Sequence, residues 1–145
     1  MKSKSAFTLV ELLIVVALIG ILSSMAVVTF TGSQKRARDA QRRSDLKQYQ
    51  TGVEAYSLRS GSYPIHQSSA IVSQDAVCKT ELKFVSCPVD PKSGWYNYYY
   101  ISDAAGSSYA VWAQLEAVIS TTYLIFCSNG KNTESSTVNW PTVCS

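Results

Sequence analysis

The stretch that decides the fold is residues 7–30, FTLVELLIVVALIGILSSMAVVTF, which carries a single charged side chain, Glu11. A helix rises about 1.5 Å per residue, so a helix of this length would cross the hydrocarbon core of a bilayer, which takes roughly 20 residues. Its apolar side chains surround the helix instead of forming one stripe, so no face is reserved for a soluble core. The segment therefore predicts a helix that lies in lipid or among other apolar helices.

The composition of the whole chain agrees with this interpretation. The chain has 145 residues, a formal net charge of +3 and only 16% charged residues, against roughly 25% in typical soluble domains. Its length fits one ordinary domain. Three tryptophans, nine tyrosines and four phenylalanines exclude a mostly disordered chain. The small positive charge argues against a nucleic-acid-binding domain, which usually carries a stronger basic excess.

Three interpretations of residues 7–30 are open at this point. A cleaved signal peptide has a shorter apolar region, about 7–15 residues, and a small-residue cleavage site, which Ser23, Ser24 and Ala26 match only weakly. A simple signal anchor would hold an outer domain, although the more basic flank follows the segment and leaves its orientation ambiguous. The third interpretation must explain Glu11, because an acid in a membrane segment costs free energy unless it has a partner.

A cut between Ala6 and Phe7 would supply that partner. Phe7 would become the first residue, and its α-amino group would lie one helical turn before Glu11. The amine of the same chain or of a neighbouring copy would then offset the cost of burying the carboxylate in an apolar bundle. This spacing favours a segment that is processed and then assembles.

Residues 6–16, AFTLVELLIVV, resemble the prepilin cleavage and methylation motif of type IV pilins and type II secretion pseudopilins. The resemblance implies that prepilin peptidase cuts the Ala6–Phe7 bond, that Phe7 is N-methylated, and that Glu11 neutralises a neighbouring subunit's amine during filament assembly. The sequence departs from the family in having Ala6 where Gly is usual, and Val28 where many members have a helix-breaking Pro.

The resemblance implies an α+β, type IV pilin-like fold. In this fold a long N-terminal helix, hydrophobic and transmembrane in its first half, packs against a small antiparallel sheet of three to four strands. The expected organisation is a leader peptide at residues 1–6, a transmembrane and filament-core helix segment at 7–30, and a pilin head domain at 31–145. The head domain includes the amphipathic half of the helix.

The residue pattern of the helix supports this fold. Leu46, Tyr49, Val53 and Tyr56 recur at helical spacing within residues 33–60. The basic side chains Arg42 and Arg43 are placed off this apolar stripe. The Gly61 and Pro64 that follow predict the end of the helix.

Three strands are expected after the helix, at residues 95–102, 109–116 and 122–127, because these stretches are rich in aromatic and β-branched residues. Alternation in the second strand places Tyr109, Val111, Ala113 and Leu115 on one face. Residues 65–94 are expected to form a loop region with a short helix near 71–77. The aromatic run 95–100 is interpreted as a strand with one face in the core and the other at a subunit interface.

Four cysteines, Cys78, Cys87, Cys127 and Cys144, occur without a Cys-x-x-Cys pair. In a chain this short, they favour disulfides in an oxidising compartment over a zinc site. Three pairings are open on sequence alone. The resemblance favours Cys78–Cys87 with Cys127–Cys144, because the second pair bounds the C-terminal loop that is familiar in pilins.

No catalytic or metal site is predicted. His66, the only histidine, is interpreted as an exposed loop residue. Among the head carboxylates Asp90, Asp103 and Glu116, no pattern places two in one cleft, as a glycosidase would require. No cofactor is expected, and calcium near Asp103 is the alternative, since some major pseudopilins bind it in loops beyond the strands. The basic residues 35–43 are interpreted as a solvated collar that forms salt bridges between subunits, not as a DNA-binding surface.

The predicted function is structural: a non-enzymatic pilin subunit of a type IV pilus-like filament. The alternatives are the major pseudopilin of a type II secretion system and, ranked lower, a membrane-anchored adhesin or enzyme head that does not polymerise. The implied partners are further copies of the chain, prepilin peptidase, an inner-membrane assembly platform with its ATPase, and lipid before assembly. The precursor would cross the cytoplasmic membrane once with its head outside the cytoplasm, and the assembled filament would be extracellular.

Overall fold

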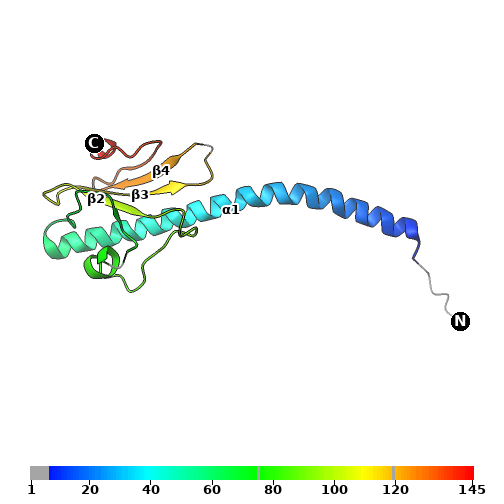
Figure 1. The fold of residues 1–145 in the computed structure, drawn as a ribbon, viewed down its shortest axis with the longest axis horizontal. Helices are drawn as coiled ribbons and strands as arrows, with labels where there is room; N and C mark the ends of the chain where they lie inside the picture. The colour runs from blue at the N-terminus through cyan, green and yellow to red at the C-terminus, as the bar shows by residue number, and fades with distance from the viewer. Residues whose placement is uncertain (1–6, 75, 119) are drawn as a thin grey trace. The chain divides into compact units, whose positions relative to one another are not determined.

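The computed structural model describes residues 7–74, 76–118 and 120–145, and no side chains for residues 25–29. The chain divides into two compact units between Lys35 and Arg36, which are considered separately below. Helix α1 (Leu9–Ser60) contributes residues to both units (Figure 1). The leader predicted at residues 1–6 lies outside the described residues.

The unit that ends at Lys35 contains the N-terminal part of α1. Every described side chain from residue 7 through residue 24 is exposed, and the large apolar ones leave between 45% and 79% of their area uncovered. In the part of the chain that the structure describes, no helix combines the length and the apolar character needed to span a membrane. The transmembrane character of residues 7–30 therefore stays a prediction.

In the unit that begins at Arg36, α1 packs through the predicted apolar stripe. Leu46, Tyr49 and Val53 are each almost completely buried. The helix ends at Ser60, and Gly61 follows with a φ of 78°, a left-handed conformation that favours glycine. The Gly61 N–H donates to the Ser57 carbonyl. The predicted stripe and helix end are both confirmed.

A five-stranded antiparallel sheet completes this unit, in the order β1-β2-β3-β4-β5. Its strands are β1 (Ala70–Ile71), β2 (Tyr99–Ser102), β3 (Tyr109–Leu115), β4 (Thr122–Cys127) and β5 (Asn132–Ser135). The α+β fold is confirmed, but the expectation of three to four strands was too low. The reason is that β1 has two residues and β5 is polar, so neither carries the apolar run by which a strand is recognised.

Two local expectations need correction. The strand expected at 95–102 begins only at Tyr99, since residues 92–96 form a turn in which the Trp95 N–H donates to the Lys92 carbonyl. The short helix expected near 71–77 is the π-helix η1 (Ala76–Glu81), and Ile71 belongs to β1 instead. A 3-10 helix, η2 (Thr142–Cys144), lies near the C-terminus.

Both faces of the sheet are covered. The predicted inner face is confirmed, because the alternate β3 residues from Tyr109 to Leu115 lie in one core with Leu46 and Tyr49 of α1. On the outer face, Trp112 and Ile125 pack against the C-terminal tail through Val138 and other apolar side chains. Figure 1 shows α1 on one side of β2, β3 and β4 and the C-terminal segment on the other.

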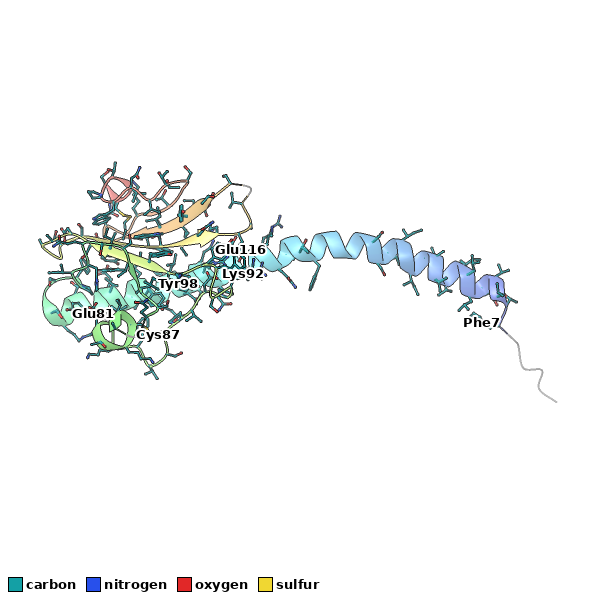
Figure 2. All side chains as sticks on the ribbon, in the orientation of Figure 1. Phe7, Glu81, Cys87, Lys92, Tyr98 and Glu116 are labelled. Carbon is teal, nitrogen blue, oxygen red and sulfur yellow. A yellow bond between two sulfur atoms is a disulfide. The ribbon has the colours of Figure 1, made fainter. Side chains whose placement is uncertain are left out.

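Two disulfides fasten the loops of this unit. Cys78 pairs with Cys87 and Cys127 pairs with Cys144, which is the pairing that the pilin resemblance favoured. The first bond closes the loop after η1, where Figure 2 labels Cys87. The second ties the C-terminal tail to the end of β4. Such cross-links stabilise a fold mainly by restricting the unfolded chain.

Candidate functional site

The first candidate site is the start of α1, where the sequence predicts processing and assembly. Phe7 lies just before the helix with 77% of its area exposed, and Figure 2 labels it at the end of the described chain. Its predicted cleavage partner, Ala6, lies outside the described residues. Processing at this bond and methylation of Phe7 therefore stay predictions.

Glu11 caps the helix that it belongs to. Its Oε2 accepts a hydrogen bond from the Thr8 N–H at 2.9 Å and another from the Thr8 hydroxyl at 2.7 Å. In return, the Glu11 N–H donates to Thr8 Oγ1 at 3.2 Å. This reciprocal arrangement is a capping box, with Thr8 as the N-cap and Glu11 as the third helical residue. The Thr-x-x-Glu signal is visible in the sequence, but our sequence analysis missed it.

The carboxylate of Glu11 can accept further hydrogen bonds while it caps the helix. Both bonds from Thr8 go to Oε2, and among the described residues none donates to Oε1. An ionised carboxylate has about four lone-pair sites on its two oxygens. A cation could therefore bind Glu11 without breaking the cap, as the predicted pairing with an amine requires.

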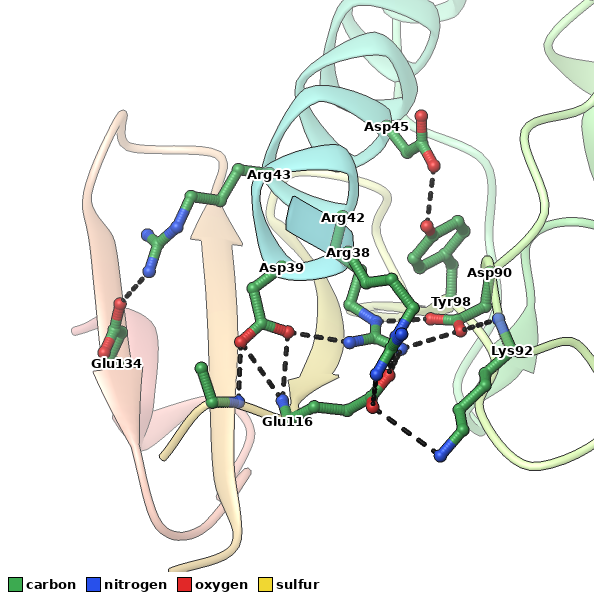
Figure 3. A network of polar contacts seen from close by, with 11 residues as sticks. Arg38, Asp39, Arg42, Arg43, Asp45, Asp90, Lys92, Tyr98, Glu116 and Glu134 are labelled. Carbon is green, nitrogen blue, oxygen red and sulfur yellow. Dashed lines mark hydrogen bonds and ion pairs between the residues drawn. The ribbon is translucent and has the colours of Figure 1, made fainter. Parts of the chain in front are cut away.

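A second polar site lies in the unit Arg36–Ser145 and is shown in Figure 3. This Arg42 cluster consists of Arg38, Asp39, Arg42, Asp90, Lys92 and Glu116.

The buried guanidinium of Arg42 is the centre of the cluster, with no exposed side-chain area. Its Nε and Nη2 donate to the two carboxylate oxygens of Asp90 at 2.6 and 2.8 Å. Its Nη1 donates to Asp39 at 2.7 Å, and Nη2 also donates to Glu116 at 2.5 Å. Arg38 and Lys92 bring two further positive charges to Glu116. Three cations thus face three carboxylates, and the formal charges of the cluster balance, with Arg38 and Lys92 contributing from partly exposed positions.

The cluster joins three segments that are distant in sequence. Besides Arg42, Asp39 accepts the backbone N–H groups of Glu116 at 2.9 Å and Ala117 at 2.8 Å, just beyond the end of β3. Asp90 accepts the Lys92 N–H at 2.8 Å. A buried ion pair offsets its desolvation only when such additional bonds satisfy the remaining groups. We therefore interpret the cluster as the link that fixes α1 to the sheet.

Hydrogen bonds within the cluster favour the charged forms of Glu116 and Arg42. Bonds from Arg38, reinforced by Arg42, lower the pKa of Glu116 to about 2. Burial by itself would lower the pKa of Arg42, but its bonds to Asp90, Glu116 and Asp39 outweigh this effect and raise it. Nearby, burial raises the pKa of Asp45, although a hydrogen bond from the Tyr98 hydroxyl acts against this rise.

The cluster overturns two expectations from the sequence. The collar at residues 35–43 is not uniformly solvated, because Arg42 lies on the buried face of α1 together with Leu46 and Tyr49. Its neighbour Arg43 is half exposed and pairs with Glu134 at 2.5 Å within the same chain. The carboxylates of Asp90 and Glu116, which were not expected to converge, meet at Arg42.

Asp103 stands apart from the cluster. Its oxygens accept hydrogen bonds from Ser107 and Ser108, which hold the turn between β2 and β3. Among the described residues, no group of three or more His, Cys, Asp or Glu side chains could hold a metal ion. The expectation that the chain has no cofactor, with calcium near Asp103 as the alternative, stays a prediction.

His66 is not the freely exposed loop residue that the sequence suggested. It is half-buried, and its Nε2 lies 3.0 Å from Glu81 Oε2. The ring packs edge-on against Tyr100. These contacts give His66 a place in the packing between β2 and η1.

Comparisons with known proteins locate the strongest family signal in the N-terminal region. Residues 1–27 match the family model described as the prokaryotic N-terminal methylation motif. The chain is 30% identical over 63 residues to type II secretion system core protein G of Aeromonas hydrophila, covering 43% of this chain and 44% of that protein. It is 34% identical over 71 residues to the type IV wide pilus major component PilA4 of Thermus thermophilus, covering 49% and 54%.

Core protein G of Vibrio cholerae is 30% identical over 64 residues, 44% of each chain. This chain spans about half the length of the curated relatives it matches. No solved structure matches it. The resemblance to type IV pilins and type II secretion pseudopilins is thus confirmed, and residues 1–27 carry the prokaryotic N-terminal methylation motif.

Proposed function

We propose that this chain is a structural subunit of a type IV pilus-like filament, assembled through the N-terminal part of α1. The observation that carries the proposal is the exposure of every described side chain from residue 7 through residue 24 in a segment that is almost entirely apolar. Contiguous exposed apolar surface of this extent marks a membrane or protein interface. Lipid covers the helix before assembly, and the helices of sister subunits cover it afterwards.

In this proposal Glu11 sets the position of each subunit. Prepilin peptidase removes the leader at the Ala6–Phe7 bond, and the amine of Phe7 on a neighbouring subunit pairs with the carboxylate. The capped geometry of Glu11 supports this role, because Oε2 is already held by Thr8 while Oε1 retains hydrogen-bonding capacity. In an apolar bundle, this ion pair offsets the desolvation of both groups.

The second candidate is the major pseudopilin of a type II secretion system. Similarity to core protein G of two organisms favours it, as similarity to PilA4 favours a pilus. Both candidates share the same processing and a filament built on the same helix. In both, the chain is a non-enzymatic building block, and an inner-membrane platform with its own ATPase supplies the energy for assembly.

The proposed function also implies where the protein is located in the cell. The precursor crosses the cytoplasmic membrane once through residues 7–30, with the head outside the cytoplasm. An oxidising compartment for the head is consistent with its two disulfides. Once assembled, a pilus subunit is extracellular.

Intact mass spectrometry of the mature protein tests the processing step. The expected mass begins at Phe7, includes one added methyl group, and lacks the hydrogens lost on forming two disulfides. A mature protein that still begins at Met1 would contradict the proposal. A chain that is cut but not methylated would contradict only the methylation.

Three variants test the role of Glu11 in assembly. Glu11→Gln keeps a side chain that completes a capping box but removes the negative charge. Glu11→Ala removes both functions, and Thr8→Ala removes the cap while keeping the charge. We expect filaments to be lost in both Glu11 variants and retained in Thr8→Ala, with membrane insertion unchanged in all three. Normal filaments from Glu11→Gln, counted by electron microscopy, would show that the charge is not needed.

A further inference from the structure

A groove of about 530 Å³ lies on the outer face of the sheet, within the unit Arg36–Ser145. Its floor comes from β2, β3 and β4 through Tyr99, Trp112 and Tyr123. One wall is the turn that carries Trp95, and another is the tail segment 136–138. The Cys127–Cys144 disulfide holds this tail against the sheet. The volume falls in the range of small-molecule sites, roughly 300–1,000 Å³.

Aromatic rings dominate the floor and rim of the groove. Tyr99 and Trp112 are cross-strand neighbours whose rings lie nearly parallel, with their centroids 5.7 Å apart and their planes 20° apart. Trp112 is only 6% exposed, so the partly exposed Tyr99 offers the more accessible ring of the pair. Trp95 at the rim leaves 84% of its area exposed. An indole kept in water at the edge of a groove is an available contact surface for a ligand.

The polar groups of the groove are all neutral. Among the described lining residues, none carries a formal charge. The side-chain amides of Asn97 and Gln114 line the groove. Each amide offers two donors and an acceptor. Hydroxyl groups of Tyr123 and Thr137 add donors and acceptors to the same surface.

We propose that this groove binds a neutral oligosaccharide. A pyranose ring presents an apolar face of C–H groups, whose partial positive charge suits the negative face of an aromatic ring. Its hydroxyl groups match the side-chain amides of Asn97 and Gln114, which offer both donors and acceptors. Nucleic acids and acidic glycans fit less well, because the described lining residues include no cation to meet their charge. The proposal is independent of whether the chain polymerises.

The binding test uses the full chain in a zwitterionic detergent without sugar groups, together with neutral tetrasaccharides of glucose, galactose and N-acetylglucosamine. Saturation-transfer NMR and quenching of tryptophan fluorescence report binding. We expect saturable binding of at least one of these probes. A uronate tetrasaccharide of equal length is expected to bind no more tightly. Absence of binding by all neutral probes, or clear preference for the uronate, would overturn the proposal.

Variants locate the site. Trp95→Ala removes an exposed ring without opening the core and is expected to weaken binding about three- to tenfold, the equivalent of one aromatic contact. Gln114→Ala is expected to weaken binding as well. Leu58→Ala, a change at an exposed residue outside the groove with 89% of its area uncovered, is the matched control and should bind normally. Equal binding by all variants would place the ligand elsewhere.

The same probes on assembled filaments address the alternative occupant, a second copy of this chain. If copies covered the groove, filaments would not bind sugar, and the fluorescence of Trp95, taken as the difference between the unmodified chain and Trp95→Ala, would change on assembly even without sugar. That pair of results would identify the groove as a subunit interface and refute a role for it in binding glycans on the filament. Sugar binding by filaments, lost in Trp95→Ala filaments, would support the proposal.

Discussion

In residues 7–24 the apolar side chains are exposed, whereas in the unit Arg36–Ser145 the charged side chain of Arg42 is completely buried. The difference comes from the partners that each finds in its own chain. Arg42 meets three carboxylates, which offset its desolvation. The apolar residues from Phe7 onward meet no comparable cover within the described part of their unit. The buried arginine thus has its partners within its own unit, and the proposed assembly would supply cover for the apolar side chains of residues 7–24 from other molecules.

The largest expected effect on stability comes from removing the buried arginine, Arg42. Arg42→Leu leaves Asp39, Asp90 and Glu116 without their shared partner in a buried setting. We expect it to lower the free energy of unfolding by about 3–5 kcal/mol. Urea unfolding of the full chain in detergent, followed by near-ultraviolet circular dichroism, measures the change. A loss below about 1 kcal/mol, the range of exposed pairs, would mean that the cluster is effectively solvated.

Removal of a disulfide is expected to have the next largest effect on the free energy of unfolding. The double variant Cys127→Ser/Cys144→Ser opens a loop with a sequence separation of 17, which costs about 3 kcal/mol in the chain-entropy model. Cys78→Ser/Cys87→Ser opens a loop with a separation of 9 and is expected to cost roughly 2.5 kcal/mol. The same unfolding measurement compares them. The reverse order would show that local packing of the loops outweighs chain entropy.

The pH dependence of stability sharpens the account of the cluster. The pKa of Glu116 falls from its ordinary 4.5 to about 2 in the folded chain, chiefly through bonds from Arg38. Because the folded value is the lower one, the stabilisation is complete above pH 4.5 and is lost as the pH falls from 4.5 toward 2. Subtracting the stability of Glu116→Gln at each pH isolates this contribution. A difference that stays constant through this interval would contradict the lowered pKa.

The smallest effect is expected at the neighbouring arginine. Arg43 pairs with Glu134, and their side chains leave 49% and 43% of their area exposed. Such pairs contribute about 0–1 kcal/mol and weaken as salt is added. Arg43→Leu is therefore the matched control for Arg42→Leu in the same unfolding assay. Equal losses from the two substitutions would remove the distinction between a buried and an exposed arginine.

The sequence predicted those parts of the molecule that short-range patterns encode. The stripe from Leu46 to Val53, the helix end before Gly61 and the 122–127 strand all appear as expected. The Thr8–Glu11 cap is encoded just as locally, by a Thr and a Glu three residues apart, although it was not predicted. Strands β1 and β5 were missed because neither has an apolar run.

Local sequence was thus enough for the N-terminal motif, the long helix and the central strands, because periodicity and capping act within a few residues. The tertiary structure alone decided the fate of Arg42, whose partners Asp90 and Glu116 lie 48 and 74 residues away. It also brought Trp95, Trp112 and the C-terminal tail to one groove. Because arginine is rarely buried, the residue type alone predicts that Arg42 is exposed to solvent. Only the packing of distant segments supplies the carboxylates that permit its burial.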